Sequence, residues 1–510
     1  MENLAAILDR NADRRPDKVV LTDARGSLTN ADLLARVNAL AEGLVDLGVR
    51  RGDRVALLMS NRIEFIEALF AITRVGAAFL PLNTRLAPAE WTYILGHSQA
   101  RAVIADGDLV GRLDPLLGEL PDLSAAVSID GVQPGWSSYD ELLAAHAGAQ
   151  VEVVDVAGSE LQRLMYTSGT TSYPKGVRIS HANVIWKNLG LMIEFGLTFE
   201  DVTAVPGPLY HVGALDMGGL ATLHAGGSLV LLPRFDTAEL VRVIEQHRAT
   251  TVWLAPAMVN ALLQHERTAT ADLTSLRVIM SGGEKMPEAR LKQMLDLLPG
   301  VWFADAYGLT ETVSSDTFMP REAMRRKLGS VGKPLSHQRV RIGDAEGRDV
   351  PCGTVGEVLL RGPKVFSGYW GDPQVNEGVF VDGWFRTGDL GRLDEDGFLY
   401  IEDRKKDMIV SGGENIASPE VERALYEHPD IVEAAVIAHP DERWGEVPHA
   451  FVVLRAGATL STEEIQEFCR TRLARFKVPK YLTIVPELPR TASGKVVKRR
   501  LRDAPTVQED

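Results

Sequence analysis

Short apolar runs alternate with helical periodicity from the N-terminus to about residue 335. An apolar run at residues 55–59 is followed by Ile63, Ile66 and Phe70, which are spaced as on one face of a helix. Further runs of strand length occupy residues 102–104, 252–254 and 278–280. This alternation predicts an α/β fold in which ligand loops follow the carboxyl ends of the sheet strands.

The pattern changes after about residue 340. Short β runs separated by turn signals at residues 344–347 and 394–397 predict a β-rich subdomain. A charged junction at residues 404–407 then leads into a small α+β domain. Its expected elements are a helix at 419–426, strands at 434–437, 450–454 and 482–485, and a helix that starts at a capping box of Ser461 and Glu464. We therefore expect an N-terminal region of residues 1–403 and a C-terminal domain of residues 404–510.

Composition excludes several classes of protein. The chain has 510 residues, 45% hydrophobic and 24% charged, as expected for a globular protein of two to four structural units. Its net charge of −14 argues against a nucleic-acid partner. No apolar run reaches membrane-spanning length, and Glu2 and Asp9 lie where a secretory signal would need basic and then apolar residues. We expect a cytoplasmic protein with no integral membrane segment. Cys352 and Cys469 lack the spacing of a disulfide framework or a zinc site.

Residues 166–176 form the most informative segment, Tyr-Thr-Ser-Gly-Thr-Thr-Ser-Tyr-Pro-Lys-Gly. Hydroxyl groups, backbone groups and the Lys175 ammonium group are donors suited to a polyphosphate. The segment is not a Walker loop, because Pro174 precedes Lys175 and Gly176 follows it, which leaves no hydroxyl for magnesium. A polar linker is the alternative, but the preceding apolar run at 164–166 predicts a strand that leads into a phosphate-binding loop.

Three smaller motifs add chemistry that a nucleotide site needs. Residues 307–311, Tyr-Gly-Leu-Thr-Glu, combine a flat ring, a hydroxyl and a carboxylate, which could stack a base, bind a phosphate and bind magnesium. Asp389 follows a glycine turn and could bind ribose hydroxyls. Lys495, in a polar loop, could offset the repulsion between a carboxylate and the α-phosphate of ATP. Ordinary turns and a solvated lysine are the alternatives when each motif is taken alone.

Together with the Arg404 junction and residues 411–415, these motifs resemble the adenylate-forming superfamily of acyl-CoA synthetases, luciferases and peptide-synthetase adenylation domains. Six motifs occur in the family's order over nearly the whole chain, which is most similar to fatty- or aryl-acid CoA ligases. The resemblance implies ATP, Mg²⁺ and coenzyme A as cofactors and a small-molecule carboxylic acid as substrate. It also implies that the C-terminal domain is mobile and rotates about a hinge at Lys406 between two half-reactions.

The resemblance assigns roles in the first half-reaction, which yields an acyl adenylate and pyrophosphate. The residues implied to hold the phosphates are Thr167, Ser168, Gly169, Thr170, Thr171 and Lys175. Thr310 would bind the α-phosphate, Glu311 the magnesium ion, and Lys495 the junction of carboxylate and phosphate. The residues implied to surround adenine and ribose are Tyr307, Gly282, Gly283, Glu284, Asp389 and Arg404.

Other residues belong to the second half-reaction, which yields a thioester and AMP. Gly412 and Gly413 would line the pantetheine tunnel, where the absence of side chains lets a thiol reach the acyl carbon. Arg85, Trp444 and Phe476 match positions around the CoA nucleotide in aryl-CoA ligases. A surface arginine and two domain-packing aromatics are the alternatives for these three.

The acyl site is expected beside His211, which matches the family's gate position. Small residues would line it and make it roomy: Gly213, Ala214, Gly218, Gly219, Gly282 and Ala306. A roomy cavity suits a bulky or long-chain monocarboxylic acid. No basic residue in these segments awaits a second carboxylate, which argues against a dicarboxylic acid.

One position departs from the family pattern. Ser172 stands where the family loop has glycine, and Tyr173 beside it is large, so the phosphate site could be strained or narrowed. One alternative is therefore a ligase weakened in adenylation that thioesterifies a preformed acyl adenylate. Another is a stand-alone adenylation enzyme that loads a carrier protein. Retention of Lys495, Gly412 and Gly413 argues against a non-enzymatic nucleotide-binding regulator. The oligomeric state stays open, a homodimer being one alternative.

Overall fold

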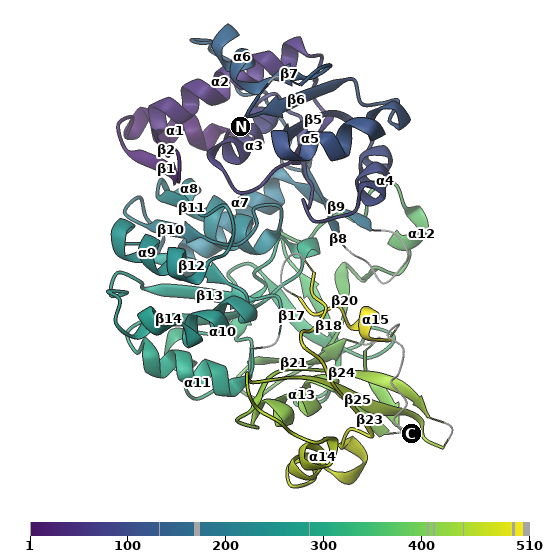
Figure 1. The fold of residues 1–510 in the computed structure, drawn as a ribbon. Helices are drawn as coiled ribbons and strands as arrows, with labels where there is room; N and C mark the ends of the chain where they lie inside the picture. Colours follow the sequence, from purple (N-terminus) through teal and green to yellow (C-terminus); the bar gives the residue numbers. More distant parts are fainter. Residues whose placement is uncertain are drawn as a thin grey trace.

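A computed structural model describes residues 2–131, 133–167, 174–284, 286–404, 407–411, 414–441, 443–491 and 495–502. These residues form two large α/β layers, a β-rich segment and a C-terminal α+β unit, which follow one another from the top to the bottom of Figure 1. The predicted α/β fold class is confirmed. The division of the chain at residues 403 and 404 stays a prediction.

The first layer is a seven-stranded sheet. Its strands, in spatial order, are β7 (Ser137–Ser138), β6 (Ala125–Ile129), β5 (Ala100–Asp106), β3 (Arg54–Leu58), β4 (Ala78–Pro81), β8 (Leu161–Thr167) and β9 (Lys175–Ser180). Only the β8–β9 pair is antiparallel among these described strands. The accompanying helices are α2 (Asn30–Asp46), α3 (Ile63–Arg74), α4 (Pro88–Ser98), α5 (Gly107–Leu113), η1 (Asp114–Glu119) and α6 (Tyr139–Ala145).

The second layer is a nine-stranded sheet. Its order is β16 (Lys333–Pro334), β15 (Thr317–Phe318), β14 (Trp302–Tyr307), β13 (Val278–Gly282), β12 (Thr251–Leu254), β10 (Val202–Val205), β11 (Ser228–Leu231), β1 (Val19–Asp23) and β2 (Gly26–Thr29). Its helical elements are α1 (Ala6–Arg14), α7 (His181–Phe195), the π-helix η2 (Gly213–Leu220), α8 (Ala221–Ala225), α9 (Thr237–His247), α10 (Pro256–Gln264), η3 (Glu266–Ala269), α11 (Glu288–Leu297), η4 (Thr310–Thr312) and η5 (Arg321–Ala323). The predicted runs at 252–254 and 278–280 are β12 and β13.

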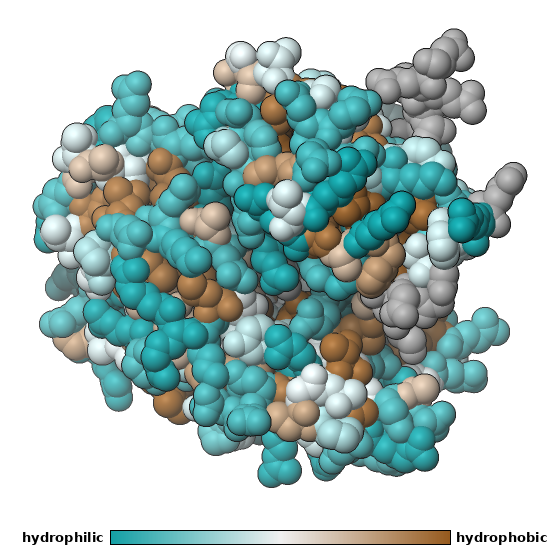
Figure 2. Space-filling view, turned by 90° about the horizontal axis from the view of Figure 1, so that it is seen from below, coloured by the Kyte–Doolittle hydropathy of each residue, from teal (hydrophilic) through white to brown (hydrophobic). Residues whose placement is uncertain are grey.

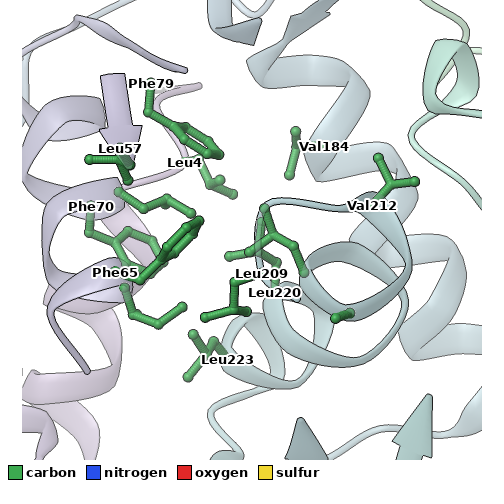
Figure 3. Packing of buried hydrophobic residues seen from close by; sticks show 14 of the residues in the cluster. Leu4, Leu57, Phe65, Phe70, Phe79, Val184, Leu209, Val212, Leu220 and Leu223 are labelled. Carbon is green, nitrogen blue, oxygen red and sulfur yellow. The ribbon is translucent and has the colours of Figure 1, made fainter. Parts of the chain in front are cut away.

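The two α/β layers share one apolar core. Every residue of α3 is buried, which explains why its sequence is apolar on more than one face. Figure 3 shows Phe65 and Phe70 of α3 facing Leu209, Leu220 and Leu223 of the second layer. The charged residues of α3 are paired: Glu67, for example, forms an ion pair with Arg36 and also accepts a hydrogen bond of 2.7 Å from the Tyr139 hydroxyl. The apolar spacing thus identified the helix, and its burial on all sides follows from packing between two layers.

The remaining strands are mostly antiparallel. The β-rich segment contains β17 (Arg339–Gly343), β18 (Gly356–Arg361), α12 (Pro373–Asn376), β19 (Phe380–Val381), β20 (Trp384–Leu393) and β21 (Leu399–Arg404). The C-terminal unit contains β22 (Ile409–Ser411), β23 (Glu414–Ile416), α13 (Ser418–Tyr426), β24 (Ile431–Asp441), β25 (Gly445–Leu454), α14 (Thr462–Arg470), η6 (Arg475–Lys477), β26 (Tyr481–Ile484) and α15 (Lys498–Arg502). The capping box predicted at Ser461 and Glu464 is present at the start of α14.

The described part of the chain contains no helix that is both long enough and apolar enough to span a bilayer. The face that carries the C-terminal unit is mostly hydrophilic, with smaller apolar areas between the polar side chains (Figure 2).

A fully buried group of charges lies between β8, α7 and η2. Asp216 of η2 accepts hydrogen bonds of 2.7 Å at both carboxylate oxygens from Arg163 of β8. The Lys187 ammonium lies 3.2 Å from the same carboxylate and donates to the Asp216 backbone carbonyl at 2.8 Å. All three side chains are inaccessible to solvent. Burial lowers the pKa of Lys187 to about 8, although Asp216 opposes this shift. The group fixes the π-helix to the strand that precedes the predicted phosphate loop.

Buried histidines predict a specific acid sensitivity. Burial lowers the pKa of His181, His224 and His449 to about 4 each. The unfolded chain binds these protons near pH 6.5, whereas the folded chain does not, so the free energy of unfolding falls as the pH drops from about 6.5 to about 4. Each histidine contributes a slope of up to about 1.4 kcal/mol per pH unit. Urea midpoints measured at intervals from pH 7.5 to 4.5 test this, and a midpoint that stays constant down to pH 5 would contradict it.

Candidate active site

The predicted site residues from the second layer follow the carboxyl ends of neighbouring parallel strands. β13 ends at Gly282, and β14 ends at Tyr307, with the register pairing Gly282 and Ala306. The segment before α15, which contains Lys495, returns from the C-terminal sheet to the middle of the molecule (Figure 1). Residues more than 200 positions apart therefore meet at one edge of the sheet, as expected for the ligand loops of an α/β fold.

A narrow cavity of about 10 Å³, room for about one water molecule, lies at this edge. It is lined by His211, Trp253, Gly282, Gly283, Glu284 and Lys495, among others. Gly283 has a φ of +99°, and a Cβ atom there would lie 3.4 Å from the Lys495 side chain. The structure thus brings together Lys495, the predicted gate histidine and the predicted adenine loop.

Glu284 joins this loop to the C-terminal segment. Its carboxylate accepts a hydrogen bond from the Val496 backbone N–H at 2.5 Å and lies 3.8 Å from the Arg490 guanidinium. Next to it, the Lys495 N–H donates to the Thr491 hydroxyl at 3.0 Å. Burial raises the pKa of Glu284, while the Val496 N–H and Arg490 oppose the shift. The contact positions Lys495 over the cavity.

Electrostatics set the charge of the two polar groups that flank the cavity. Burial and then the Lys495 charge lower the pKa of His211 to about 3, so its ring is neutral near pH 7. His211 Nδ1 accepts a hydrogen bond from the Gly213 N–H at 3.1 Å, which places the ring hydrogen on Nε2. The pKa of Lys495 is lowered by burial and by Arg404, and the carboxylates of Glu284, Asp389 and Glu311 oppose the shift. A neutral donor and a cation can therefore face one carboxylate.

The predicted base and ribose residues contact one another. The Tyr307 hydroxyl donates to Asp389 at 2.7 Å, and the other Asp389 oxygen lies 3.2 Å from Arg404 Nε. Pairing of β20 with β21 places Asp389 directly opposite Arg404. The Asp389 side chain is buried and the Arg404 side chain is half exposed. This arrangement sets an aromatic ring, a carboxylate and a guanidinium beside each other from two separate sheets.

The turn after Thr310 and Glu311 has an unusual backbone. Residues 313–315 all have left-handed φ values, between 54° and 64°, although none is glycine. Such a run costs free energy and persists only where its surroundings hold it. The buried Lys364 ammonium donates to the carbonyls of Thr312 at 2.9 Å and Ser314 at 2.6 Å. Gly308 allows the close approach, since a Cβ atom there would lie 2.3 Å from the Ser315 nitrogen.

Glu311, the predicted magnesium ligand, is positioned by Tyr369. The Tyr369 hydroxyl donates to Glu311 at 2.8 Å, and the Lys175 ammonium lies 5.2 Å from the centre of the same ring. Among the described residues no group of three or more acidic, histidine or cysteine side chains could hold a metal ion by itself. A single carboxylate fits Mg²⁺ nonetheless, because this ion commonly binds through one or two carboxylates together with substrate phosphates. Lys175 lies opposite Thr167 in the β8–β9 pair.

Comparisons with known proteins agree with this geometry. One family model, described as AMP-binding enzyme, matches residues 8–370, and a second, described as AMP-binding enzyme C-terminal domain, matches residues 420–495. The chain belongs to the AMP-binding enzyme family. It is therefore a member of the adenylate-forming superfamily that its motifs resemble, and an AMP-forming acid–thiol ligase by class.

Some similar AMP-binding enzymes are named for ring-containing acids, and others for long-chain fatty acids. A feruloyl-CoA synthase from Amycolatopsis sp is 38% identical over 509 residues, covering 97% of each chain. An indoleacetate–CoA ligase from Aromatoleum aromaticum is 38% identical over 499 residues, covering 98% of this chain and 97% of the relative. The solved structure of the anthranilate CoA ligase AuaEII in complex with anthranoyl-AMP superposes with a TM-score of 0.92 at 29% identity, covering 98% of this chain and 96% of that chain.

Several predicted residues of this AMP-binding enzyme lie outside the described residues. They are Ser168, Gly169, Thr170, Thr171, Ser172 and Tyr173 of the phosphate loop, Lys406 at the predicted hinge, and Gly412 and Gly413 of the predicted tunnel. Their assigned roles stay predictions.

The three residues predicted around the CoA nucleotide are exposed. Trp444 and Phe476 are 46% and 43% exposed, and Arg85 is also exposed. The alternative in which the two aromatics pack between domains is therefore not supported by this arrangement. The structure does not bring these residues to the Lys495 cavity.

Small residues predicted to make the acyl cavity roomy pack closely against neighbours in this structure. The Trp253 ring fills the space beside Gly213, where a Cβ atom would lie 2.4 Å from a ring carbon. Gly282 instead contacts Ala306 closely, where a Cβ atom would lie 2.7 Å from the carbonyl oxygen. Sequence reasoning missed Trp253 because it belongs to an ordinary apolar strand run. It also missed Lys364 and Tyr369, which contact Thr312 and Glu311, 52 and 58 positions earlier in the chain.

Proposed function

We propose that this AMP-binding enzyme is an acid–CoA ligase for a bulky, ring-bearing monocarboxylic acid, which it activates with ATP and Mg²⁺ and then transfers to coenzyme A. The observation that carries the proposal is the position of Lys495, beside neutral His211 and the Gly282–Glu284 loop, at the edge where Tyr307, Asp389 and Glu311 also gather. The names of the similar feruloyl-CoA and indoleacetate–CoA ligases support a ring-bearing substrate.

In the proposed first half-reaction, a carboxylate oxygen of the acid attacks the α-phosphorus of ATP, and pyrophosphate leaves. Lys495 lies between the two anionic reactants and lowers their repulsion, while the Nε2–H of His211 orients the carboxylate. Asp389 and Arg404 hold the ribose and Tyr307 the adenine ring. Glu311 would hold Mg²⁺, which would neutralise charge on the phosphates, and Lys175, Thr167 and Thr310 bind the phosphate oxygens.

In the proposed second half-reaction, the C-terminal domain of residues 404–510 rotates about Lys406 and removes Lys495 from the cavity. The CoA thiolate then attacks the acyl carbon and AMP leaves. Gly412 and Gly413 would border the thiol path. The partial exposure of Trp444 and Phe476 and the exposure of Arg85 support their role in binding the CoA nucleotide.

Pyrophosphate exchange and thioester formation test the two half-reactions separately. We expect ATP–pyrophosphate exchange that depends on ferulic, indoleacetic or anthranilic acid, and the corresponding acyl-CoA by mass spectrometry when CoA is added. Palmitic acid and a carrier protein carrying a phosphopantetheine arm serve as comparison substrates.

The outcomes separate the alternatives. Thioester formation from a synthetic acyl adenylate without pyrophosphate exchange would favour the ligase weakened by Ser172. Loading of the carrier protein without CoA turnover would favour the stand-alone adenylation enzyme. Turnover of palmitic acid alone would contradict the ring-bearing substrate.

A further inference from the structure

Tyr369 lies beside β9, the strand that follows the predicted phosphate loop. It forms an isolated antiparallel bridge with Val177, and the Trp370 N–H donates to the Gly176 carbonyl at 2.8 Å. On its other side, the Tyr369 N–H donates to Asn376 Oδ1 at 2.7 Å, and Asn376 Nδ2 donates to the Tyr369 carbonyl at 2.9 Å. The backbone of Tyr369 is therefore fixed next to the end of the loop.

The Tyr369 side chain contacts an anion with its hydroxyl and a cation with its ring. The hydroxyl donates to Glu311 Oε1 at 2.8 Å, and the Lys175 ammonium lies 5.2 Å from the ring centre. Burial and then the Glu311 charge raise the pKa of Tyr369 well above its ordinary value, so the hydroxyl keeps its proton and stays a donor. Tyrosine can serve both partners at once, because its tip donates a hydrogen bond and its face attracts cations.

Lys175 and Glu311 carry opposite charges, yet they do not form an ion pair with each other in the described part of the chain. Both are assigned to parts of one ligand: Lys175 to the phosphates of ATP, and Glu311 to Mg²⁺. A direct pair between them would have to break before the ligand could bind, which would lower the apparent affinity. Tyr369 gives each charge a neutral partner instead, and a carboxylate has acceptor sites beyond the one that Tyr369 uses.

We propose that Tyr369 is a positioning residue for the triphosphate and its metal ion: it holds Glu311 by its hydroxyl, holds Lys175 by its ring, and thereby keeps the two charges from pairing. It acts through these two residues. The inference rests on the proposed function and adds a residue on which the ATP site depends. A merely structural tyrosine would affect ATP binding equally with and without Mg²⁺, whereas the proposed role divides the effect between the two ends of the side chain.

Tyr369→Phe tests the hydroxyl, because it keeps the ring beside Lys175 and the 5.0 Å ring contact with Phe366. The readout is the Kd for ATP, measured by isothermal titration calorimetry without any acid substrate, once in saturating Mg²⁺ and once in EDTA. We expect the Kd in Mg²⁺ to rise about tenfold, as is usual when a metal ligand loses its hydrogen-bond partner, and the Kd in EDTA to stay within about twofold. An unchanged Kd in Mg²⁺, or an equal rise in both media, would overturn the proposal.

Tyr369→Leu also removes the ring and tests the separation of the charges. We expect the Kd for ATP in EDTA to rise as well, because Lys175 can then pair with Glu311. Glu311→Gln added to Tyr369→Leu should tighten ATP binding in EDTA about fivefold more than Glu311→Gln does in the wild type. Any loss of packing cancels in this comparison, since it is measured within each background. Equal effects of Glu311→Gln in the two backgrounds would overturn the separation of charges.

Tyr400 of β21 provides the matched control, because its ring also faces a cation. The Arg392 guanidinium lies 4.4 Å from the centre of the Tyr400 ring. Tyr400→Phe and Tyr400→Leu should leave the Kd for ATP unchanged in both media. A difference between Mg²⁺ and EDTA as large as that of Tyr369→Phe would count against a specific role of Tyr369.

Failure of the two proposals would look different. If the wild type forms acyl-CoA thioesters but Tyr369→Phe binds ATP as the wild type does, only the Tyr369 proposal fails. If the variants show the expected difference between Mg²⁺ and EDTA but no acid supports pyrophosphate exchange or thioester formation, the proposed function fails and the role of Tyr369 stands. If the wild type does not bind ATP, both proposals fail.

Discussion

Lys495→Met is expected to slow acyl-adenylate formation by about 10²- to 10³-fold, the usual effect of removing one preorganised electrostatic group from an active site. The physical reason is that an anionic carboxylate must approach the negatively charged α-phosphate. The Lys495 ammonium lies at the cavity where the two would meet, and Glu284 holds its segment in place. Methionine keeps the length of the side chain and removes the charge.

Pyrophosphate exchange measures the effect on the first half-reaction. Thioester formation from a synthetic acyl adenylate measures the second, which we expect to stay within about threefold of wild type because Lys495 takes no part in it. Lys292→Met, at an exposed position on α11, is the control for loss of a lysine and should leave both rates unchanged. An equal loss in both half-reactions would contradict the assigned role and indicate a general structural effect.

Asp216→Ala is expected to lower the free energy of unfolding by about 3–5 kcal/mol, the range for breaking a buried ion pair from one side. The substitution leaves the Arg163 guanidinium and the Lys187 ammonium buried without their counter-charge. The loss arises mainly from these unpaired cations, since the net contribution of an intact buried pair is small. Urea denaturation followed by tryptophan fluorescence measures the effect.

Two comparison variants separate this explanation from a general effect of losing a carboxylate. Asp272→Ala breaks the exposed Asp272–Arg248 pair, in which both side chains are more than half exposed, together with the hydrogen bonds from Thr274, and should lower the free energy of unfolding much less than Asp216→Ala does. The triple variant Asp216→Leu, Arg163→Met, Lys187→Met removes all three charges and should recover much of the lost stability. Equal losses for Asp216→Ala and Asp272→Ala would contradict the buried-charge explanation.

Local sequence signals predicted the secondary-structure elements and motifs, but not the tertiary contacts between them. The capping box at Ser461 and the apolar runs of β12 and β13 depend on neighbouring residues, so the sequence is sufficient to find them. The Tyr307–Asp389 hydrogen bond joins positions 82 residues apart, and no local pattern encodes it. Motif order suggested that the two residues share a site, and the sheet register then gave the geometry.

The volume of the acyl cavity was the property that sequence reasoning predicted least well. The small residues after His211 indicated an open cavity, because the cavity volume was inferred from the size of these residues alone. The neighbouring side chain that fills the space was not considered. That neighbour, Trp253, is contributed by another strand and lies against Gly207 and Gly213. Packing of this kind depends on tertiary contacts, as does the burial of Lys364 under an acidic turn.

The Lys364 contacts also lower the entropic cost of binding a nucleotide at Glu311. Lys364 and Asp316 already hold the backbone next to Glu311 in its left-handed path. The conformational entropy of that segment is therefore lost during folding and not during binding. A binding partner of Glu311 meets a carboxylate that is already oriented, and the free energy of its contacts goes into affinity.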